Sequence, residues 1–325
     1  MRFLVVGGAG YIGSHMLKHL LDAGHAVVVA DNFSTGHRSA LIGGTLVELD
    51  IANADALDGL FASNQFDAVF HFASFIQVGE SVSDPAKYYE NNLSATLTLL
   101  QAMRRAEVKN FIFSSTAAVY GDPAYVPIDE AHPKAAINPY GRSKWMVEQM
   151  LEDFDHAYGL KSVCLRYFNA AGADPDGQLG ERHEPETHLL PLILQAAAGR
   201  REAITVFGRD YDTPDGTCIR DYVHVADLVA AHALAVDYLL AGGTSTAFNL
   251  GNGHGFSVQQ VIETARRVTG QTIAVGDAPR RAGDPPRLVA DARRAKALLG
   301  WQPQFAALEQ IVAHAWAWEQ QYPWH

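Results

Sequence analysis

The sequence contains little cysteine and no long apolar run. Only Cys164 and Cys218 occur among 325 residues, which excludes a disulfide framework and a thiolate-rich metal site and favours a reducing, cytoplasmic location. The longest apolar stretches, near 189–198 and 225–241, are interrupted by polar residues, well short of the roughly 20 apolar residues of a membrane span. The amino terminus begins with a strand-like run rather than a leader. We therefore expect neither membrane insertion nor export.

The sequence also lacks a basic cluster. Its 25 Lys and Arg residues are outnumbered by 36 Asp and Glu residues, giving a net charge of −11. A negative field repels nucleic-acid backbones and anionic membranes, so we expect neither as a partner. An anionic ligand would have to be held by a few local arginines and by backbone N–H groups.

Short apolar runs alternate with helical patterns through the first half of the chain. Apolar runs without polar alternation are typical of strands covered on both faces. The alternation predicts an α/β fold with a doubly wound parallel sheet of the Rossmann type. The predicted strands are 2–7, 26–30, 46–49, 68–72, 110–115 and 162–166, and the predicted helices are 11–23, 55–63, 87–107 and 140–158.

The composition changes after about residue 170. Residues 171–188 are polar and rich in turn formers, and an apolar helical pattern starts near Leu189. We therefore predict a first domain over 1–170 and a smaller α/β substrate domain over 171–325. A strand followed by a long helix near 220–240 suggests that the chain returns to the first domain over 217–250.

A glycine-rich loop follows the first predicted strand, with the sequence Gly7-Gly8-Ala9-Gly10-Tyr11-Ile12-Gly13. This spacing allows a tight turn, close approach of a pyrophosphate and a helix amino terminus aimed at the phosphates. Asp31 ends the second strand, where an acid accepts hydrogen bonds from the adenosine ribose and repels a 2′-phosphate. The predicted cofactor is therefore NAD, bound by Gly7, Gly10, Tyr11, Ile12, Gly13, Asp31 and Asn32.

Asp50 and Ile51 follow the third predicted strand. They could contact the adenine ring. The Asp50 carboxylate would make polar contacts, and the Ile51 side chain would pack against the flat face of the ring. A helix cap at this place fits the spacing equally well.

Tyr140 and Lys144 lie four residues apart, just after Pro139. This spacing places a phenol and an ammonium on one face of a helix. A tyrosine titrates near pH 10, and a neighbouring cation stabilises the phenolate. The pair therefore predicts a catalytic tyrosine whose pKa is lowered by Lys144.

Motifs along the whole chain resemble the extended short-chain dehydrogenase/reductase superfamily and, within it, the family of UDP-glucose 4-epimerases. They are GGAGYIGSH at 7–15, HFASFIQVGES at 71–81, YYENN at 88–92, NFIFSSTAAVYG at 110–121, PYGRSKWMVEQ at 139–149, LRYFNAAGA at 165–173, DGTCIRDYVHVADL at 215–228, FNLGNG at 248–253 and PRRAGDPP at 279–286.

The resemblance implies roles for individual residues. Tyr140 would be the catalytic base, Lys144 would hold the nicotinamide ribose, and Thr116 would bond the sugar O4. Further contacts to the cofactor would come from Phe72, Ala73, Asn91, Ser114 and Tyr167. The uridine diphosphate sugar would be held by Asn169, His188, Leu189, Phe207, Arg220, Tyr222, Arg281, Asp284 and Leu288.

The implied reaction is NAD-dependent interconversion of UDP-glucose and UDP-galactose through a 4-keto sugar, catalysed by an isomerase that forms a homodimer. UDP-pentose or UDP-N-acetylhexosamine epimerisation and a catalytically inactive NAD sensor are the alternatives. Dehydration is disfavoured because Ala117 and Ala118 follow Thr116 and cannot transfer protons. Three positions depart from the family pattern: Ser74 replaces Gly, Ile76 replaces Lys and His188 replaces Asn.

Histidine pairs occur at 15 and 19 and at 183 and 188. Neither pair has the HExxH spacing of zinc peptidases, and no third ligand is evident from the sequence. We therefore predict no metal site.

Overall fold

A seven-stranded parallel sheet forms the centre of the computed structural model, which describes residues 1–281 and 284–321. Its strand order is β11-β6-β5-β4-β1-β2-β3. The chain moves outward from β1 to β3 and then crosses to β4 on the other side of β1. Ligands of doubly wound sheets bind beyond the carboxyl ends of the strands at such a switch point. The strands are β1 (Arg2–Val6), β2 (Ala26–Asp31), β3 (Thr45–Glu48), β4 (Ala68–His71), β5 (Asn110–Thr116), β6 (Lys161–Tyr167) and β11 (Thr246–Leu250).

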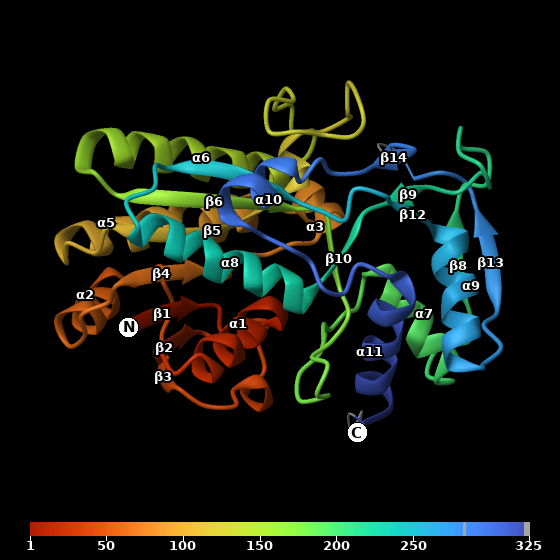
Figure 1. Cartoon of the computed structure of the whole chain (residues 1–325), viewed down its shortest axis with the longest axis horizontal. Helices are drawn as coiled ribbons and strands as arrows, with labels where there is room; N and C mark the ends of the chain where they lie inside the picture. Colours follow the sequence, from red (N-terminus) through yellow and green to blue (C-terminus); the bar gives the residue numbers. More distant parts are fainter. Residues whose placement is uncertain (282–283, 322–325) are drawn as a thin grey trace.

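Helices cover both faces of this sheet (Figure 1). One face packs against α1 (Tyr11–Asp22), α8 (Val225–Leu240) and α10 (Arg293–Leu299), in a core that includes Phe70 and Phe248. The other face packs against α2 (Ala54–Ala62), α5 (Ala95–Arg105) and α6 (Pro139–Tyr158), in a core that includes Phe111 and Phe113. Because helices cover both faces of the sheet and exclude water, the strands consist of continuous apolar runs. The predicted doubly wound fold is confirmed.

The elements after residue 168 other than α8, α10 and β11 form a second group beside the sheet, on the right of Figure 1. Its core packs α7, α9 and α11 around Ile193, Ile262 and Ile311. Its helices are α7 (Leu189–Ala197), α9 (Val258–Thr269) and α11 (Leu308–Gln321), and its strands are β7 (Asn169–Ala171), β8 (Ile204–Phe207), β9 (Ile219–Arg220), β10 (Tyr222–His224), β12 (Phe256–Ser257), β13 (Val275–Ala278) and β14 (Arg287–Leu288).

The chain crosses between the two groups more than once. β7 pairs with β10 in the second group, α8 then packs on the large sheet, and β11 pairs in parallel with β6 to become its edge strand. The large sheet therefore includes residues from both halves of the sequence.

The region predicted as one helix over 87–107 is a composite. It consists of α4 (Pro85–Tyr88), a π-helical segment over Tyr89–Ser94, and α5, preceded by α3 (Val78–Ser83). Single turns of π-helix occur often at functional sites, and Asn91 and Asn92 lie in this one. Short 3-10 helices occur at Arg38–Ala40 and Ala117–Val119. Within 1–281 and 284–321, no helix is long and apolar enough to cross a membrane.

Candidate active site

The glycine loop connects β1 to α1 at the switch point of the sheet. Gly7 has φ +79°, and a side chain there would lie 2.5 Å from the backbone nitrogen of Ala73. A Cβ on Gly13 would lie 2.1 Å from the carbonyl oxygen of Gly7. Both positions therefore require glycine, the first for its left-handed backbone and the second because helix α1 approaches the strand so closely.

The amino terminus of α1 suits a pyrophosphate. Gly10 is the N-cap and supplies no side-chain hydrogen bond. The first-turn amides of a helix, here those of Tyr11, Ile12 and Gly13, have no intrahelical acceptor and attract anions. A phosphate approaching Gly10 would meet no Cβ, because this residue has none.

Asp31 lies at the carboxyl end of β2 and is 8% exposed. Its Oδ2 accepts from Ala9 N–H at 2.8 Å, and its Oδ1 accepts from Phe33 N–H at 2.8 Å. The carboxylate thus holds the glycine loop in place while each oxygen keeps a second lone pair for a ribose hydroxyl. The structural part of this role was not apparent from the sequence.

Asp50 and Asn32 meet on the far side of the predicted adenosine site. Asn32 Nδ2 donates to Asp50 Oδ2 at 3.0 Å, and Asp50 Oδ1 accepts from Ala52 N–H at 2.8 Å. The N-cap of α2 is Asn53 rather than Asp50. Asp50 therefore shapes the turn before that helix, whereas Ile51 is buried, 6% exposed.

Tyr140 stands in the first turn of α6, close to Thr116 at the end of β5. Asn138 caps this helix by accepting from Gly141 N–H at 2.8 Å, and Pro139 occupies its first turn. Burial raises the pKa of Tyr140, and a hydrogen bond with Thr116 acts in the opposite direction. The sequence predicted that Lys144 would lower this pKa. That prediction was wrong for the protein without cofactor, because desolvation dominates and the opposing contact comes from Thr116.

Lys144 is buried, only 1% exposed. Its ammonium donates to Ser74 Oγ at 2.6 Å and to the Ser114 carbonyl oxygen at 2.9 Å, and it lies 4.8 Å from the centre of the Phe113 ring. Desolvation lowers the pKa of Lys144 to about 7, against the raising effect of Glu148. With two of its three donors engaged by the protein, one donor is left for a ribose hydroxyl.

The residues predicted to contact the nicotinamide end of the cofactor lie at or just beyond the carboxyl ends of β4, β5 and β6. The Ser114 and Tyr167 hydroxyls form a short hydrogen bond between β5 and β6. Phe72 and Ala73 follow β4, and Ala73 lies against Gly7. Tyr140 contributes to raising the pKa of Tyr167, although burial is the main cause, so the two phenols lie near each other.

Asn91 and its neighbour Asn92 order the loop after β4. Asn92 is buried, exchanges hydrogen bonds with both backbone groups of Phe75 and accepts from Asn91 Nδ2 at 2.9 Å. Sequence reasoning selected Asn91 alone. Both residues belong to the YYENN motif, and nothing in the motif indicates that Asn92 is the one bonded to Phe75.

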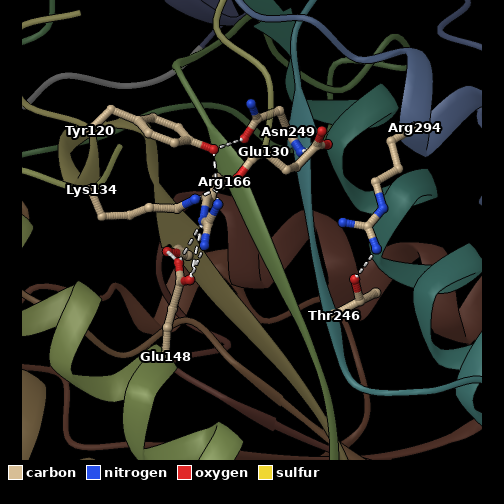
Figure 2. Close-up of polar contacts among 9 residues, drawn as sticks. Tyr120, Glu130, Lys134, Glu148, Arg166, Thr246, Asn249 and Arg294 are labelled. Carbon is tan, nitrogen blue, oxygen red and sulfur yellow. Dashed lines mark hydrogen bonds and ion pairs between the residues drawn. The ribbon is translucent and has the colours of Figure 1, made fainter. Parts of the chain in front are cut away.

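A buried ion pair, also missed from the sequence, supports α6 and β6 behind the tyrosine–lysine pair. Arg166 Nη2 donates to Glu148 Oε2 at 2.5 Å, and both side chains are 5% exposed. Ser115 also donates to Glu148, and Arg166 Nη1 donates to the Tyr120 hydroxyl at 2.9 Å. Figure 2 shows Arg166 between Glu148 and Tyr120. Glu148 follows Lys144 by one helical turn, so the pair joins the catalytic helix to the sheet.

The predicted nucleotide pocket combines strands of the second group. Asn169 and Tyr222 are register partners in β7 and β10. Arg220 Nη2 donates to Asp284 Oδ1 at 2.6 Å, and the Arg281 guanidinium lies 3.8 Å from the centre of the Phe207 ring. A diphosphate approaching these arginines would compete with Asp284 for Arg220.

Three further residues predicted to contact the UDP-sugar lie on other elements. Two of them are at the start of α7, and the third is in β14. His188 is the N-cap of α7 and Leu189 its first residue. Leu288 pairs with Arg220 in register and packs against the apolar cluster of Ala117, Val119, Tyr120 and Ile128. Leu288 therefore lies close to the turn that follows Thr116. Residues 282–283 of the PRRAGDPP motif lie outside the described residues.

The fold and this site define a class: Rossmann enzymes with a tyrosine–lysine pair that use NAD. The observations that fit the dinucleotide are the glycine cradle, the uncapped amino terminus of α1 and the acid at the end of β2.

Comparison with known proteins gives the family. Residues 3–251 match the model of the NAD dependent epimerase/dehydratase family. A UDP-glucose 4-epimerase from Halalkalibacterium halodurans is 52% identical over 323 residues, which cover 99% of this chain and 97% of that protein. The crystal structure of UDP-glucose 4-epimerase from Brucella ovis in complex with NAD is 51% identical, has a TM-score of 0.95 and is matched over 97% of each chain. The UDP-Glc/GlcNAc 4-epimerase from Campylobacter jejuni is 45% identical, with a TM-score of 0.87 and 99% coverage of both chains. The chain belongs to the NAD dependent epimerase/dehydratase family.

Proposed function

We propose that this protein is an NAD-dependent 4-epimerase that interconverts UDP-glucose and UDP-galactose. The proposal rests on Thr116, Tyr140 and Lys144, beside a glycine loop that fits NAD. Thr116 is the last residue of β5, and Tyr140 and Lys144 lie in the first turns of α6. The names and cofactor of the relatives support it.

The chain's own residues move the proton. The Tyr140 phenolate accepts the proton of the sugar 4-hydroxyl, and the phenol so formed later returns it. Thr116 orients the phenol by its hydrogen bond and stands between it and the sugar O4. Lys144 holds the nicotinamide ribose and, while protonated, favours the phenolate. NAD, when bound, supplies the acceptor and then the donor of the hydride at C4.

Inversion requires the sugar to turn while its nucleotide stays bound. Arg220 and Arg281 are placed to clamp the diphosphate through charge-assisted hydrogen bonds. The anchors are concentrated on the nucleotide, so the hexose can present either face to the cofactor.

The test is conversion of UDP-galactose to UDP-glucose by purified protein without added NAD. Tyr140→Phe is expected to abolish turnover while the fold is retained. Tyr125→Phe, which changes an exposed tyrosine outside the site, is the matched control and should turn over normally. Full activity of Tyr140→Phe would refute the assignment, and absence of turnover in the unmodified protein would favour an NAD sensor.

The sugar range and the setting are also part of this proposal. Action on UDP-N-acetylhexosamines is the favoured second activity because a relative with 45% identity is named for both sugars; a product panel including UDP-pentoses tests the remaining alternative. We place the enzyme in galactose metabolism in the cytoplasm, since both cysteines are free and buried. We further propose a homodimer formed through residues 87–107 and 140–158, which sedimentation analysis would test.

A further inference from the structure

Four ligand-type side chains gather in the segment before α7. They are Glu181, His183, Glu186 and His188, here called the 181–188 cluster, and one ligand atom from each lies within 4.8 Å of all the others. In the sequence, His183 and His188 bracket acidic residues, but the spacing predicts no third ligand. The loop places two carboxylates with them, a grouping that the irregular spacing of 181, 183, 186 and 188 concealed.

The ligand atoms of the cluster lie close enough together to surround one small cation, and one pair of them, His188 Nδ1 and Glu181 Oε1, is hydrogen-bonded. His188 Nδ1 lies 2.6 Å from Glu181 Oε1 and 3.5 Å from Glu186 Oε1. His183 Nδ1 lies 3.2 Å from Glu181 Oε1 and 3.7 Å from Glu186 Oε2. Ligands at 2.0–2.1 Å from a tetrahedral zinc ion are separated from one another by about 3.3 Å. The observed distances bracket this value.

The cluster contains two buried carboxylates and one buried histidine nitrogen that lacks a well-aligned hydrogen bond. The Glu181 and Glu186 side chains are only 6% and 5% exposed, and buried carboxylates require a counter-charge. His183 Nδ1 is buried, and among the described residues it has no hydrogen-bond partner of acceptable geometry. A divalent cation between the carboxylates would satisfy both the charge and the nitrogen.

We propose that the 181–188 cluster binds one zinc ion as a structural site. Two imidazoles and two carboxylates suit zinc, whereas calcium and magnesium prefer shells made of oxygen alone. Because the protein supplies four ligands, no position is left open for a reacting water, which separates this site from catalytic zinc centres.

The zinc ion would join three parts of the molecule. The Tyr11 ring of the glycine loop lies edge-on to His183, with ring centres 6.4 Å apart, and its hydroxyl donates to the Gly172 carbonyl oxygen at 2.6 Å. Trp318 of α11 donates to the Glu181 carbonyl oxygen at 3.2 Å. His188 begins α7 beside Leu189. The ion would therefore fix the segment that runs from the cofactor loop to the predicted nucleotide pocket.

The competing arrangement is a pair of histidine–glutamate ion pairs without metal. Burial lowers the pKa of His183, but the two carboxylates outweigh it and raise the pKa to about 9. Protonated histidines could then neutralise the glutamates. The two arrangements differ in whether metal is bound and in whether a chelator changes stability.

The experiment measures zinc content and thermal unfolding of purified full-length protein after zinc loading and dialysis. We expect about one zinc per chain, a lower Tm after treatment with a strong chelator and its recovery on adding zinc. Glu181→Gln and His183→Gln should lose the zinc and the chelator effect, whereas His254→Gln, which changes an exposed histidine between β11 and β12, should keep both.

Several outcomes would overturn the proposal. They are zinc below one tenth of the chain concentration with an unchanged Tm in chelator, or zinc retained at full content by Glu181→Gln and His183→Gln. If both variants fail to fold, X-ray absorption of the zinc-loaded unmodified protein decides: nitrogen and oxygen ligands support the site, and sulfur ligands contradict it.

Discussion

The Lys144 ammonium donates a hydrogen bond of 2.6 Å to the hydroxyl of Ser74, a residue in the loop after β4. The resemblance to the family leads us to expect glycine at this position, and the Ser74 hydroxyl adds this hydrogen bond. It gives the buried cation an acceptor that glycine could not supply. Ser74 is therefore a positioning residue that acts through Lys144.

Replacing Ser74 by alanine should shift the pH dependence of turnover. An acceptor favours the ammonium, so its loss lowers the pKa of Lys144 further below its present value of about 7. Because the protonated lysine is the active form, activity is lost as the pH rises through this pKa, and the alkaline limb of kcat should move to lower pH. At pH 8 we expect kcat to fall about tenfold, equivalent to about 1.4 kcal/mol.

Ser74→Thr keeps the hydroxyl and should restore the alkaline limb. Measuring kcat from pH 6 to 9 for the three proteins checks this. Identical pH profiles for the alanine and threonine variants would show that the hydroxyl does not act on Lys144.

Removing one partner of the Arg166–Glu148 pair should destabilise the protein strongly. Glu148→Gln leaves a guanidinium buried without its carboxylate, which typically costs about 3–5 kcal/mol. Combining Glu148→Leu with Arg166→Met removes both charges and should cost less than the single change. Urea unfolding measures the free energies; a single-variant loss below about 1 kcal/mol would contradict the idea that the pair is buried and mutually dependent.

Three buried histidines predict a loss of stability in mild acid. Burial is the main cause that lowers the pKa of His15 to about 4, of His71 to about 3 and of His232 to about 4. Above pH 6.5 these groups are neutral in both folded and unfolded chains. Below pH 6.5 the unfolded chain takes up protons that the folded chain does not, so stability falls as the pH decreases towards 4.

Each such histidine contributes a slope of up to about 1.4 kcal/mol per pH unit. His232→Asn should reduce the slope of unfolding free energy between pH 6 and 5 by about that amount. His254→Asn, at an exposed site, serves as the control. An unchanged slope in His232→Asn would mean that His232 accepts a proton in the folded protein.

Leu288 should control how large a sugar the site accepts. It lies in β14 beside Arg220 and packs near the turn after Thr116. Leu288→Tyr adds bulk and should lower kcat/KM for UDP-N-acetylgalactosamine about tenfold or more while changing that for UDP-galactose less than threefold, a difference of at least about 0.7 kcal/mol. Equal rates on the N-acetylated sugar before and after the change would refute a gate at this position.

Local features, and features whose residues have a fixed spacing, could be predicted from the sequence. The alternation of apolar runs predicted the large sheet, and the glycine spacing, Asp31 and the Tyr140–Lys144 pair could be found because each depends on neighbours within one strand, turn or helix. The Arg166–Glu148 pair could not be found in this way. Each residue lies in a different motif, 18 positions apart, and neither motif indicates that the two side chains meet. The Ser74 contact depends on residues 70 positions apart, and the 181–188 cluster depends on the path of an irregular loop.

The direction in which the pKa of Tyr140 shifts shows another limit of prediction from sequence. The sequence identified the cation next to the phenol but could not show how deeply the phenol is buried. Burial raises the pKa of Tyr140 and outweighs the opposing hydrogen bond with Thr116. Electrostatic conclusions drawn from spacing alone therefore omit the cost of removing a group from water.

The position of β11 has a consequence for how the protein is made. β6 ends at Tyr167, but its partner on the outer side starts only at Thr246. While the ribosome is still extending the polypeptide, a strand edge stays exposed and open to unwanted pairing. Nascent chains shorter than about 250 residues should therefore be the ones that depend on chaperones, and a gene cut after codon 170 should yield a product that aggregates.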